Sequence, residues 1–202
     1  MRARDLMTAP VITVHPWTSA KEAAGLLAAH GFTALPVVDD DDRLVGIVTE
    51  ADLIRGRIPA DPRYVHEPRE ATAGKPVGDL MTSPATAMDG GTDLAELCQA
   101  LVDARIRAMP IVDGAAVIGI VTRGDIVRVL ARDDSEIARD VKHRLEIYGG
   151  SGRWQVGVRD GFVHITDRFD DDTDRHVAQL LALAVPGVVA ADTAYAGEEQ
   201  TR

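Results

Sequence analysis

The sequence predicts a mixed α/β and α+β protein, in which two copies of a β-α-β-β-α repeat pack as a pair and precede a small α-β-β-α-β domain. Three observations predict this fold class. A six-residue block, DLMTAP at 5–10, returns as DLMTSP at 79–84. Two further blocks repeat in the same order, and after residue 131 the pattern of apolar residues changes. Internal repetition over this length indicates that one structural unit was duplicated.

The two further blocks carry most of the internal similarity. ALPVVD at 34–39 returns as AMPIVD at 108–113, and GIVTEAD at 46–52 returns, after a one-residue deletion, as GIVTRGD at 119–125. Because three blocks match in one order, chance is an implausible explanation.

Each copy is expected to begin with a strand and a helix. In the first copy, residues 11–14 form the expected strand, and Ser19 and Glu22 have the spacing of a capping box. Gly31 stands where a left-handed residue would end the helix. Asp93 begins the equivalent helix of the second copy.

A hairpin and a second helix complete each copy. The first copy has expected strands at 35–38 and 44–48, joined by four consecutive aspartates at 39–42. Carboxylates suit hard cations, so these aspartates raise the alternative of a metal site. We favour a solvated turn, because consecutive aspartates repel one another and lack the spaced ligands of a calcium loop.

The domain organisation follows from these patterns. We expect the repeats at 1–56 and 79–131, an extended connector rich in proline and charge at 57–78, and the small domain at 133–196. In the small domain, Ile137, Val141 and Leu145 indicate a first helix, and two strands at 154–158 and 163–165 flank the turn at Asp160-Gly161. A second helix is indicated by Val177, Leu180, Leu181 and Ala184, and a final strand by residues 188–195.

Composition and charge disfavour several classes of function. The formal charge of -10 is spread over both parts of the chain, which disfavours binding to nucleic acid or anionic lipid. Cys98 is the only cysteine, and no apolar segment is long enough to cross a bilayer, so we expect a cytoplasmic protein without disulfides. The histidines have no metal-ligand spacing and join no triad, so we expect neither a metal nor a catalytic site.

The two repeats resemble a tandem pair of CBS domains, or Bateman module. The resemblance covers roughly residues 1–131 and rests on the twice-repeated Ala-Leu/Met-Pro and Gly-Ile-Val-Thr-x-x-Asp blocks. It implies two clefts between the packed copies that hold AMP, ATP or another adenosyl compound as a regulatory ligand, not as a cofactor.

The C-terminal segment is similar to a BON domain, over about 133–196. The residues that carry this resemblance are 156–163 and 185–189. The sequence departs from the family pattern after the second strand, where Thr166-Asp167 stands in place of a glycine. The resemblance implies contact with phospholipid or protein, and the acidic balance favours protein.

Thr49 and Thr122 each end a strand and begin a helix, where free backbone N–H groups favour phosphate. Asp52 and Asp125 lie three residues further on, where a carboxylate can accept two hydrogen bonds from a ribose diol. The same spacing also makes a capping box that needs no ligand. The family resemblance favours the ligand interpretation at both positions.

The resemblance implies that each cleft takes base-side residues from one copy and Thr-x-x-Asp from the other. The favoured cleft combines Thr13, Phe32, Ala34, Arg107, Thr122, Arg123 and Asp125. The weaker cleft combines Thr49, Asp52, Ala87, Ile106 and Ala108. In the favoured cleft, Arg107 or Arg123 supplies a cation for phosphate. The weaker cleft lacks the hydroxyl of Thr13, and Glu50 places negative charge at the position of Arg123.

Two functions remain open at this point. The first is a non-enzymatic regulator that binds an adenosyl ligand, forms a homodimer and acts on a separate effector protein. The alternative is a dimerisation scaffold without a small ligand, whose BON-like domain docks on a protein or membrane.

Overall fold

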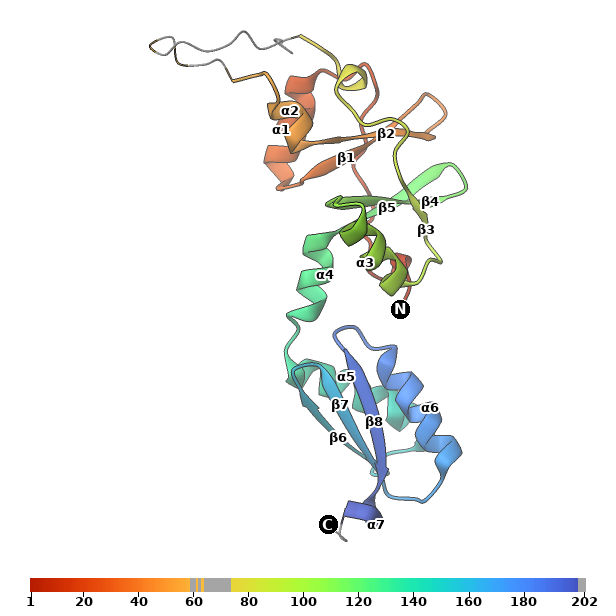
Figure 1. Ribbon diagram of the computed structural model, residues 1–202. Coiled ribbons are helices and arrows are strands. Elements are labelled where there is room, and N and C mark those ends of the chain that lie inside the picture. Colours follow the sequence, from red (N-terminus) through yellow and green to blue (C-terminus); the bar gives the residue numbers. More distant parts are fainter. Residues whose placement is uncertain (59–60, 62, 64–73, 200–202) are drawn as a thin grey trace. The chain divides into compact units, whose positions relative to one another are not determined.

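A computed structural model describes residues 1–58, 61, 63 and 74–199 (Figure 1). The elements are η1 (Ala3–Asp5), α1 (Ala20–His30), β1 (Ala34–Val38), β2 (Leu44–Thr49), α2 (Glu50–Ile54), η2 (Val77–Asp79), β3 (Met88–Asp89), α3 (Leu94–Asp103), β4 (Ala108–Asp113), β5 (Ala116–Thr122), α4 (Arg123–Leu130), α5 (Asp134–Gly149), β6 (Trp154–Arg159), β7 (Phe162–Asp167), α6 (Asp172–Leu183), β8 (Ala190–Tyr195) and α7 (Ala196–Glu199). Most of the connector expected at 57–78, including Pro59, Pro62 and Pro68, lies outside the described residues. No described helix is long and apolar enough to cross a membrane.

The chain forms two compact units, Arg2–Arg123 and a second unit that begins at Gly124 and includes Met1. The first unit holds both hairpins, β1–β2 and β4–β5, each antiparallel. The N-caps Ser19 and Asp93 are confirmed, since Ser19 accepts from the Glu22 N–H and Asp93 accepts from the Ala95 N–H, but neither described helix has the reciprocal bond of the predicted capping box. Gly31 ends α1 in the left-handed conformation, as predicted.

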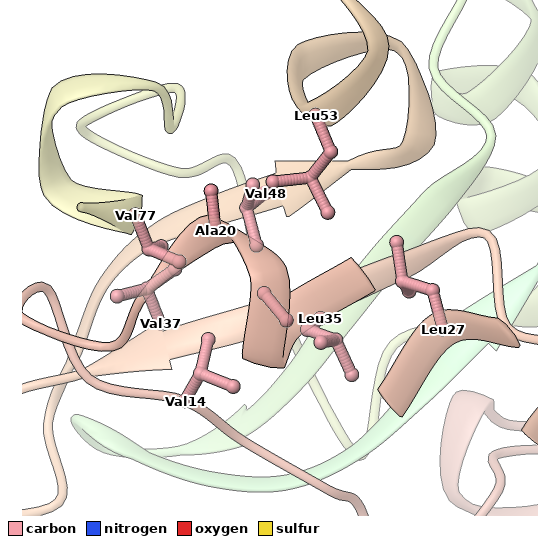
Figure 2. Close-up of a cluster of buried hydrophobic side chains, with 9 residues drawn as sticks. Val14, Ala20, Leu27, Leu35, Val37, Val48, Leu53 and Val77 are labelled. Carbon is pink, nitrogen blue, oxygen red and sulfur yellow. The ribbon is translucent and has the colours of Figure 1, made fainter. Parts of the chain in front are cut away.

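The core of the first hairpin is apolar (Figure 2). Its buried side chains come from the strands, from both helices and from the chain that follows the connector: Val14, Ala20, Ala23, Leu27, Leu35, Val37, Val48, Leu53 and Val77. Val77 is fully buried although it lies just before the second sequence repeat.

Residues 11–14, expected as a strand, form only a single bridge from Val14 to Val37. In the second copy, the equivalent strand β3 pairs with β4, and Gly90 N–H donates to the Val112 carbonyl at 3.2 Å. Pro16 stands at the position equivalent to Gly90 and has no N–H to donate, so the bond from Gly90 to Val112 has no counterpart in the first copy. Residues 85–87, the equivalents of 11–13, also lie outside β3.

The first residues of each copy pair with the other copy; we call these segments, residues 3–8 and 77–82, the straps. Thr8 pairs with Ile120 of β5, and Thr82 pairs with Ile47 of β2. The backbone bonds before these bridges correspond as well: Ala3 and Arg4 donate to Thr92 and Gly90 carbonyls, and Val77 and Gly78 donate to Thr18 and Pro16 carbonyls. The boundaries of the sequence repeat therefore differ from those of the structural repeat, because the first block of each copy pairs with the other copy.

The second unit contains the predicted α-β-β-α-β order in α5, β6, β7, α6 and β8. Strands β6 and β7 are antiparallel, and β8 joins β7 in parallel. The core packs one face of this sheet against the two helices, with Ile137, Val141, Leu145, Val163 and Ile165 among its buried residues.

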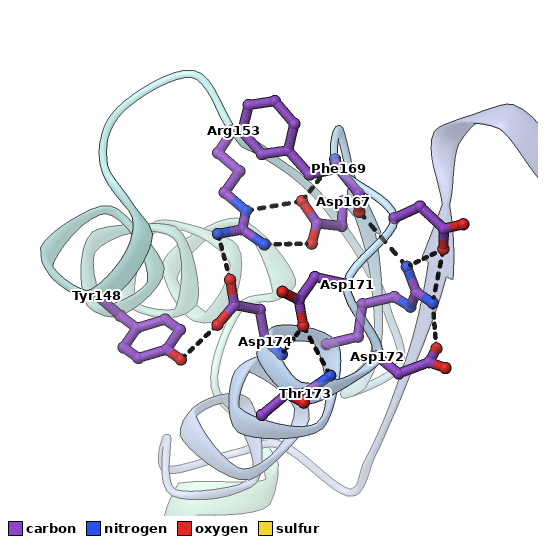
Figure 3. A network of polar contacts seen from close by, with 10 residues as sticks. Tyr148, Arg153, Asp167, Phe169, Asp171, Asp172, Thr173 and Asp174 are labelled. Carbon is purple, nitrogen blue, oxygen red and sulfur yellow. Dashed lines mark hydrogen bonds and ion pairs between the residues drawn. The ribbon is translucent and has the colours of Figure 1, made fainter.

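A buried ion network closes one end of this domain (Figure 3). Arg153 Nε and Nη2 donate to Asp167 at 2.8 and 2.7 Å, and Arg153 Nη1 lies 2.6 Å from Asp174. Asp167 has no exposed surface. Burial acts to raise the pKa of Asp167, but the hydrogen bonds from Arg153 and from the Phe169 N–H, together with the charges of Arg153 and Arg175, outweigh burial and hold that pKa below its usual value.

Asp167 therefore has a physical role at the place where the BON resemblance implies a glycine. Strand β7 continues through Asp167, and the turn comes afterwards. Tyr148 also joins the network by donating its hydroxyl to Asp174 at 2.7 Å.

Candidate functional site

The first Thr-x-x-Asp corner lies at the junction of β2 and α2. Thr49 N and Oγ1 donate to Asp52 Oδ2 at 3.0 and 2.7 Å, and Asp52 N donates to Thr49 Oγ1 at 3.4 Å. This is a complete capping box, so the structural alternative is present here. Asp52 Oδ1 takes no part in it and has no partner among the described residues, which leaves one carboxylate oxygen for a ligand.

The second corner has the same chain order. Thr122 is the last residue of β5, α4 begins at Arg123, and Asp125 lies in its first turn. Asp125 is buried, with 6% exposure, and its Oδ1 accepts from Arg128 Nη1 at 2.8 Å. A buried carboxylate at a helix start is an uncommon arrangement that normally has bonded partners.

The structure places the two predicted alanines in one buried cluster. Ala34 and Ala108 are both buried and form one cluster with Ile120. Ala34 is the cross-strand neighbour of Thr49, and Ala108 is the neighbour of Thr122. The first residue of each hairpin is thus the cross-strand neighbour of its own threonine, and both first residues belong to one buried cluster.

The remaining base-side residues are half-buried. This group contains Thr13, Phe32, Ala87 and Ile106. The Phe32 ring stacks on His30, with 5.0 Å between ring centroids and 15° between planes. One face of Phe32 is therefore already occupied, and a ligand base would have to use the other face or the ring edge.

The two predicted cations differ in how they are held. Arg123 Nη2 donates to the Leu101 carbonyl at 2.6 Å, so its guanidinium is bound to the end of α3. The exposed Arg107 side chain has no partner among the described residues. Arg123 N–H donates to the Arg107 carbonyl at 3.0 Å, which fixes the Arg107 backbone at the start of α4.

Thr33 was missed in the sequence and occupies the position of Arg107 in the first copy. Its Oγ1 is buried and has no hydrogen-bond partner within the described part of the chain. Its carbonyl accepts from Glu50 N–H at 3.2 Å, the bond equivalent to that between Arg107 and Arg123. The alignment of the two copies pairs Thr33 with Arg107, and this was the available signal.

Comparison with known proteins decides the family. The CBS domain profile matches residues 3–58 and 77–132. The chain belongs to the CBS domain family. These CBS domains come as a tandem pair, and the matched residues end at 132, so the similarity of the C-terminal domain to BON domains stays a prediction.

Two curated relatives illustrate the similarity. The chain is 35% identical over 134 residues to the chloroplastic CBS domain-containing protein CBSX2 of Arabidopsis thaliana, covering 57% of this chain and 56% of that protein. It is 31% identical over 128 residues to Hypoxic response protein 1 of Mycobacterium tuberculosis, covering 63% of this chain and 84% of that protein. The chain thus spans about half the length of CBSX2.

Two solved structures share the fold of the pair. The CBS pair of protein MJ0100, in complex with 5-methylthioadenosine and S-adenosyl-L-methionine, matches with a TM-score of 0.55 and 28% identity, covering 64% of this chain and 94% of that one. CBSX2 in complex with AMP matches with a TM-score of 0.51 and 33% identity, covering 63% and 93%. Related CBS pairs therefore bind adenosine-containing ligands.

Proposed function

We propose that the CBS pair of this chain binds an adenosine-containing ligand, such as AMP, ATP or S-adenosylmethionine, and that the chain acts as a non-catalytic regulator. The observation that carries the proposal is the doubled Thr-x-x-Asp corner at the start of α2 and α4, with Thr49 and Thr122 beside the shared cluster of Ala34 and Ala108. The adenosyl ligands of related pairs support it.

Each part of the ligand has a proposed partner. The ribose diol donates to Asp52 or Asp125, and the phosphate meets the threonine hydroxyl and free N–H groups of a helix start. We assign the positive charge for phosphate to Arg107, since the Arg123 guanidinium is bonded to the Leu101 carbonyl. Arginine suits phosphate because its planar fork donates two parallel hydrogen bonds.

The two clefts are proposed to differ in affinity. The favoured cleft has the Thr13 hydroxyl and Arg107, where the weaker cleft has Ala87 and Thr33. Phe32 and Ile106 supply the apolar surface for the base in their respective clefts. The favoured cleft therefore offers an additional hydroxyl and an additional cation.

Calorimetric titration of the full chain with AMP, ATP, NAD and S-adenosylmethionine tests the proposal. At least one compound should bind, and Asp125→Ala should weaken it by about tenfold or more, because hydrogen bonds to a charged group are lost. Asp52→Ala should have a smaller effect, and Asp192→Asn is a charge-matched control on an exposed side chain of the C-terminal domain. Absence of binding by all four compounds would contradict the function, and equal losses in Asp52→Ala and Asp125→Ala would contradict the asymmetry.

A specific observation favours a second candidate, a dimerisation scaffold without a small ligand. The Thr49–Asp52 capping box is complete without any ligand, so this corner has a sufficient structural role. On this alternative, thermal unfolding stays unchanged at high nucleotide concentration. A ligand at 100 times its dissociation constant would instead stabilise the folded chain by about 2.7 kcal/mol.

The partner on which the regulator acts is also a proposal. We infer that the C-terminal domain contacts an effector protein in preference to a membrane, since the chain carries a net charge of -10. The homodimer, the cytoplasmic location and the domain limits 1–56, 79–131 and 133–196 stay predictions. Sedimentation of the full chain with and without AMP measures the oligomeric state.

A further inference from the structure

A cavity of about 250 Å³ lies in the CBS pair, away from the adenosyl clefts. It opens beside Val112 and Asp113, at the end of β4 opposite Ala108. Asp113 lies five residue steps along the strand from Ala108, which corresponds to about 17 Å. The cavity is also too small for most complete cofactors, whose pockets usually start at about 300 Å³.

Arg4 supplies an anion-binding group at this cavity. Its N–H and its Nε both donate to the Gly90 carbonyl at 3.0 Å, which fixes the start of the guanidinium. The terminal nitrogens Nη1 and Nη2 have no acceptor among the residues that the structure describes. A guanidinium held in this way is ready to donate two parallel hydrogen bonds to a carboxylate.

Two carboxylates line the same cavity. Asp89 Oδ1 accepts from Gly91 N–H at 2.7 Å, whereas the exposed Asp113 carboxylate has no partner in the described part of the chain. Both would repel a purely anionic ligand such as phosphate. The arrangement instead favours a ligand that carries a cationic group beside its anionic group.

The rest of the cavity wall is apolar, and the space inside the cavity depends on the absence of a side chain at Gly90. Met7, Val112 and Ile118 line it. A Cβ atom placed on the buried Gly90 would lie 3.1 Å from Ile118 Cδ1 and 3.7 Å from Arg4 Cβ. A side chain at position 90 would therefore take up part of the cavity.

In the first copy, side chains fill the position equivalent to this cavity. Gly78 stands in the position of Arg4, and Pro16 stands in the position of Gly90. A Cβ atom on Gly78 would lie 3.1 Å from Pro16 Cβ, and the His15 ring bonds the Val38 carbonyl at 3.1 Å. The straps of the two copies make equivalent backbone bonds, so the cavity in the second copy results from particular side chains rather than from the fold.

We propose that this cavity binds a small zwitterion of the class of free α-amino acids with an aliphatic side chain. The ligand carboxylate pairs with Arg4, its ammonium group with Asp113, and its side chain contacts Met7, Val112 and Ile118. Arg4 and Met7 belong to the strap whose Thr8 pairs with Ile120, so the ligand bridges the strap and the strands of the second copy. Amino-acid binding would therefore stabilise the association of the two copies.

Calorimetric titration of the full chain with L-valine, L-leucine and L-methionine tests this proposal. We expect at least one to bind. For L-leucine, 4-methylpentanoate lacks the ammonium group and 3-methylbutylamine lacks the carboxylate, so each should bind at least about tenfold more weakly than the parent amino acid. Absence of binding by all three amino acids, or equal binding by a tested amino acid and its truncated analogues, would overturn the proposal.

Variants locate the site and separate it from the adenosyl clefts. Arg4→Gln and Gly90→Ala should each weaken amino-acid binding by about tenfold or more and leave AMP binding unchanged. Lys21→Gln, an exposed change of equal charge on α1, is the control and should have no effect. Unchanged amino-acid affinity in Arg4→Gln would overturn the proposal, and circular dichroism verifies that each variant is folded.

Discussion

In the CBS pair, the polar side chains with a proposed function lie at strand ends or line a cavity. In the C-terminal domain, the polar side chains with the shortest ion pairs bond one another. Asp52 Oδ1 and the Arg107 side chain have no partner among the described residues. Arg153, by contrast, is bonded to both Asp167 and Asp174, and Asp167 is fully buried. Asp52 Oδ1 and Arg107 are thus available to a ligand, whereas Arg153, Asp167 and Asp174 stabilise their own domain.

The largest effect is expected from breaking the internal network. Asp167→Asn removes the charge that faces Arg153 and should lower the free energy of unfolding of the C-terminal domain by about 3 kcal/mol, because the guanidinium stays largely buried with only Asp174 opposite. Chemical denaturation followed by Trp154 fluorescence measures this, in a Trp17→Phe background that removes the other tryptophan.

The exposed pair of His164 and Asp192 provides the matched control. Asp192 is 74% exposed, so Asp192→Asn should change the free energy of unfolding by less than about 1 kcal/mol. Equal effects of Asp167→Asn and Asp192→Asn would show that the buried network does not hold the domain.

Acid should weaken the same domain. The pKa of Asp167 is lowered in the folded state, so its contribution is complete above the unfolded value of about 3.9 and is lost as the pH falls through the folded value. Asp174, whose pKa is lowered by the Tyr148 hydroxyl and by Arg153, acts in the same direction. Unfolding free energies below about pH 4 should therefore decline more steeply in the parent than in Asp167→Asn; parallel pH profiles would contradict this.

A smaller effect is expected from the straps of the CBS pair. A Cβ atom on Gly119 would lie 2.7 Å from Met7 Cγ, and one on Gly46 would lie 3.0 Å from the Thr82 carbonyl oxygen. Gly119→Ala and Gly46→Ala should each destabilise the pair by about 1–3 kcal/mol through overpacking. Gly25→Ala is the control, because it meets no atom within 4 Å and should be neutral or stabilising. If thermal denaturation showed no difference among the three variants, the straps would not constrain the pair.

Much of the fold could be predicted because local rules and duplication acted together. The caps at Ser19 and Asp93 and the left-handed Gly31 follow from neighbouring residues alone. The strand predicted at 11–14 is wrong for residues 11–13, which lie outside any strand as do their equivalents 85–87, and Pro16 removes one further donor from the first ladder. The crossed straps could not be read from the repeat, since a sequence match does not say which copy a segment packs on.

The candidate site shows the same division. The place of Thr49 and Thr122 at a strand end, with an aspartate in the first helical turn, could be predicted from spacing, and at Thr49 the structure shows the capping box that was the alternative interpretation. The engagement of Arg123 by the Leu101 carbonyl depends on a contact between distant residues, and sequence spacing carries no information on it. The same holds for Arg153 and Asp167, whose partnership arises from the pairing of β6 and β7.

Hydrogen exchange of the full chain, with and without AMP, tests the central claim most directly. At about 100 times the dissociation constant, bound AMP should slow exchange at the cleft segments 32–36, 49–53, 106–110 and 122–126, and leave 154–167 unchanged. Unchanged exchange throughout, or slowing confined to 154–167, would contradict ligand binding by the CBS pair.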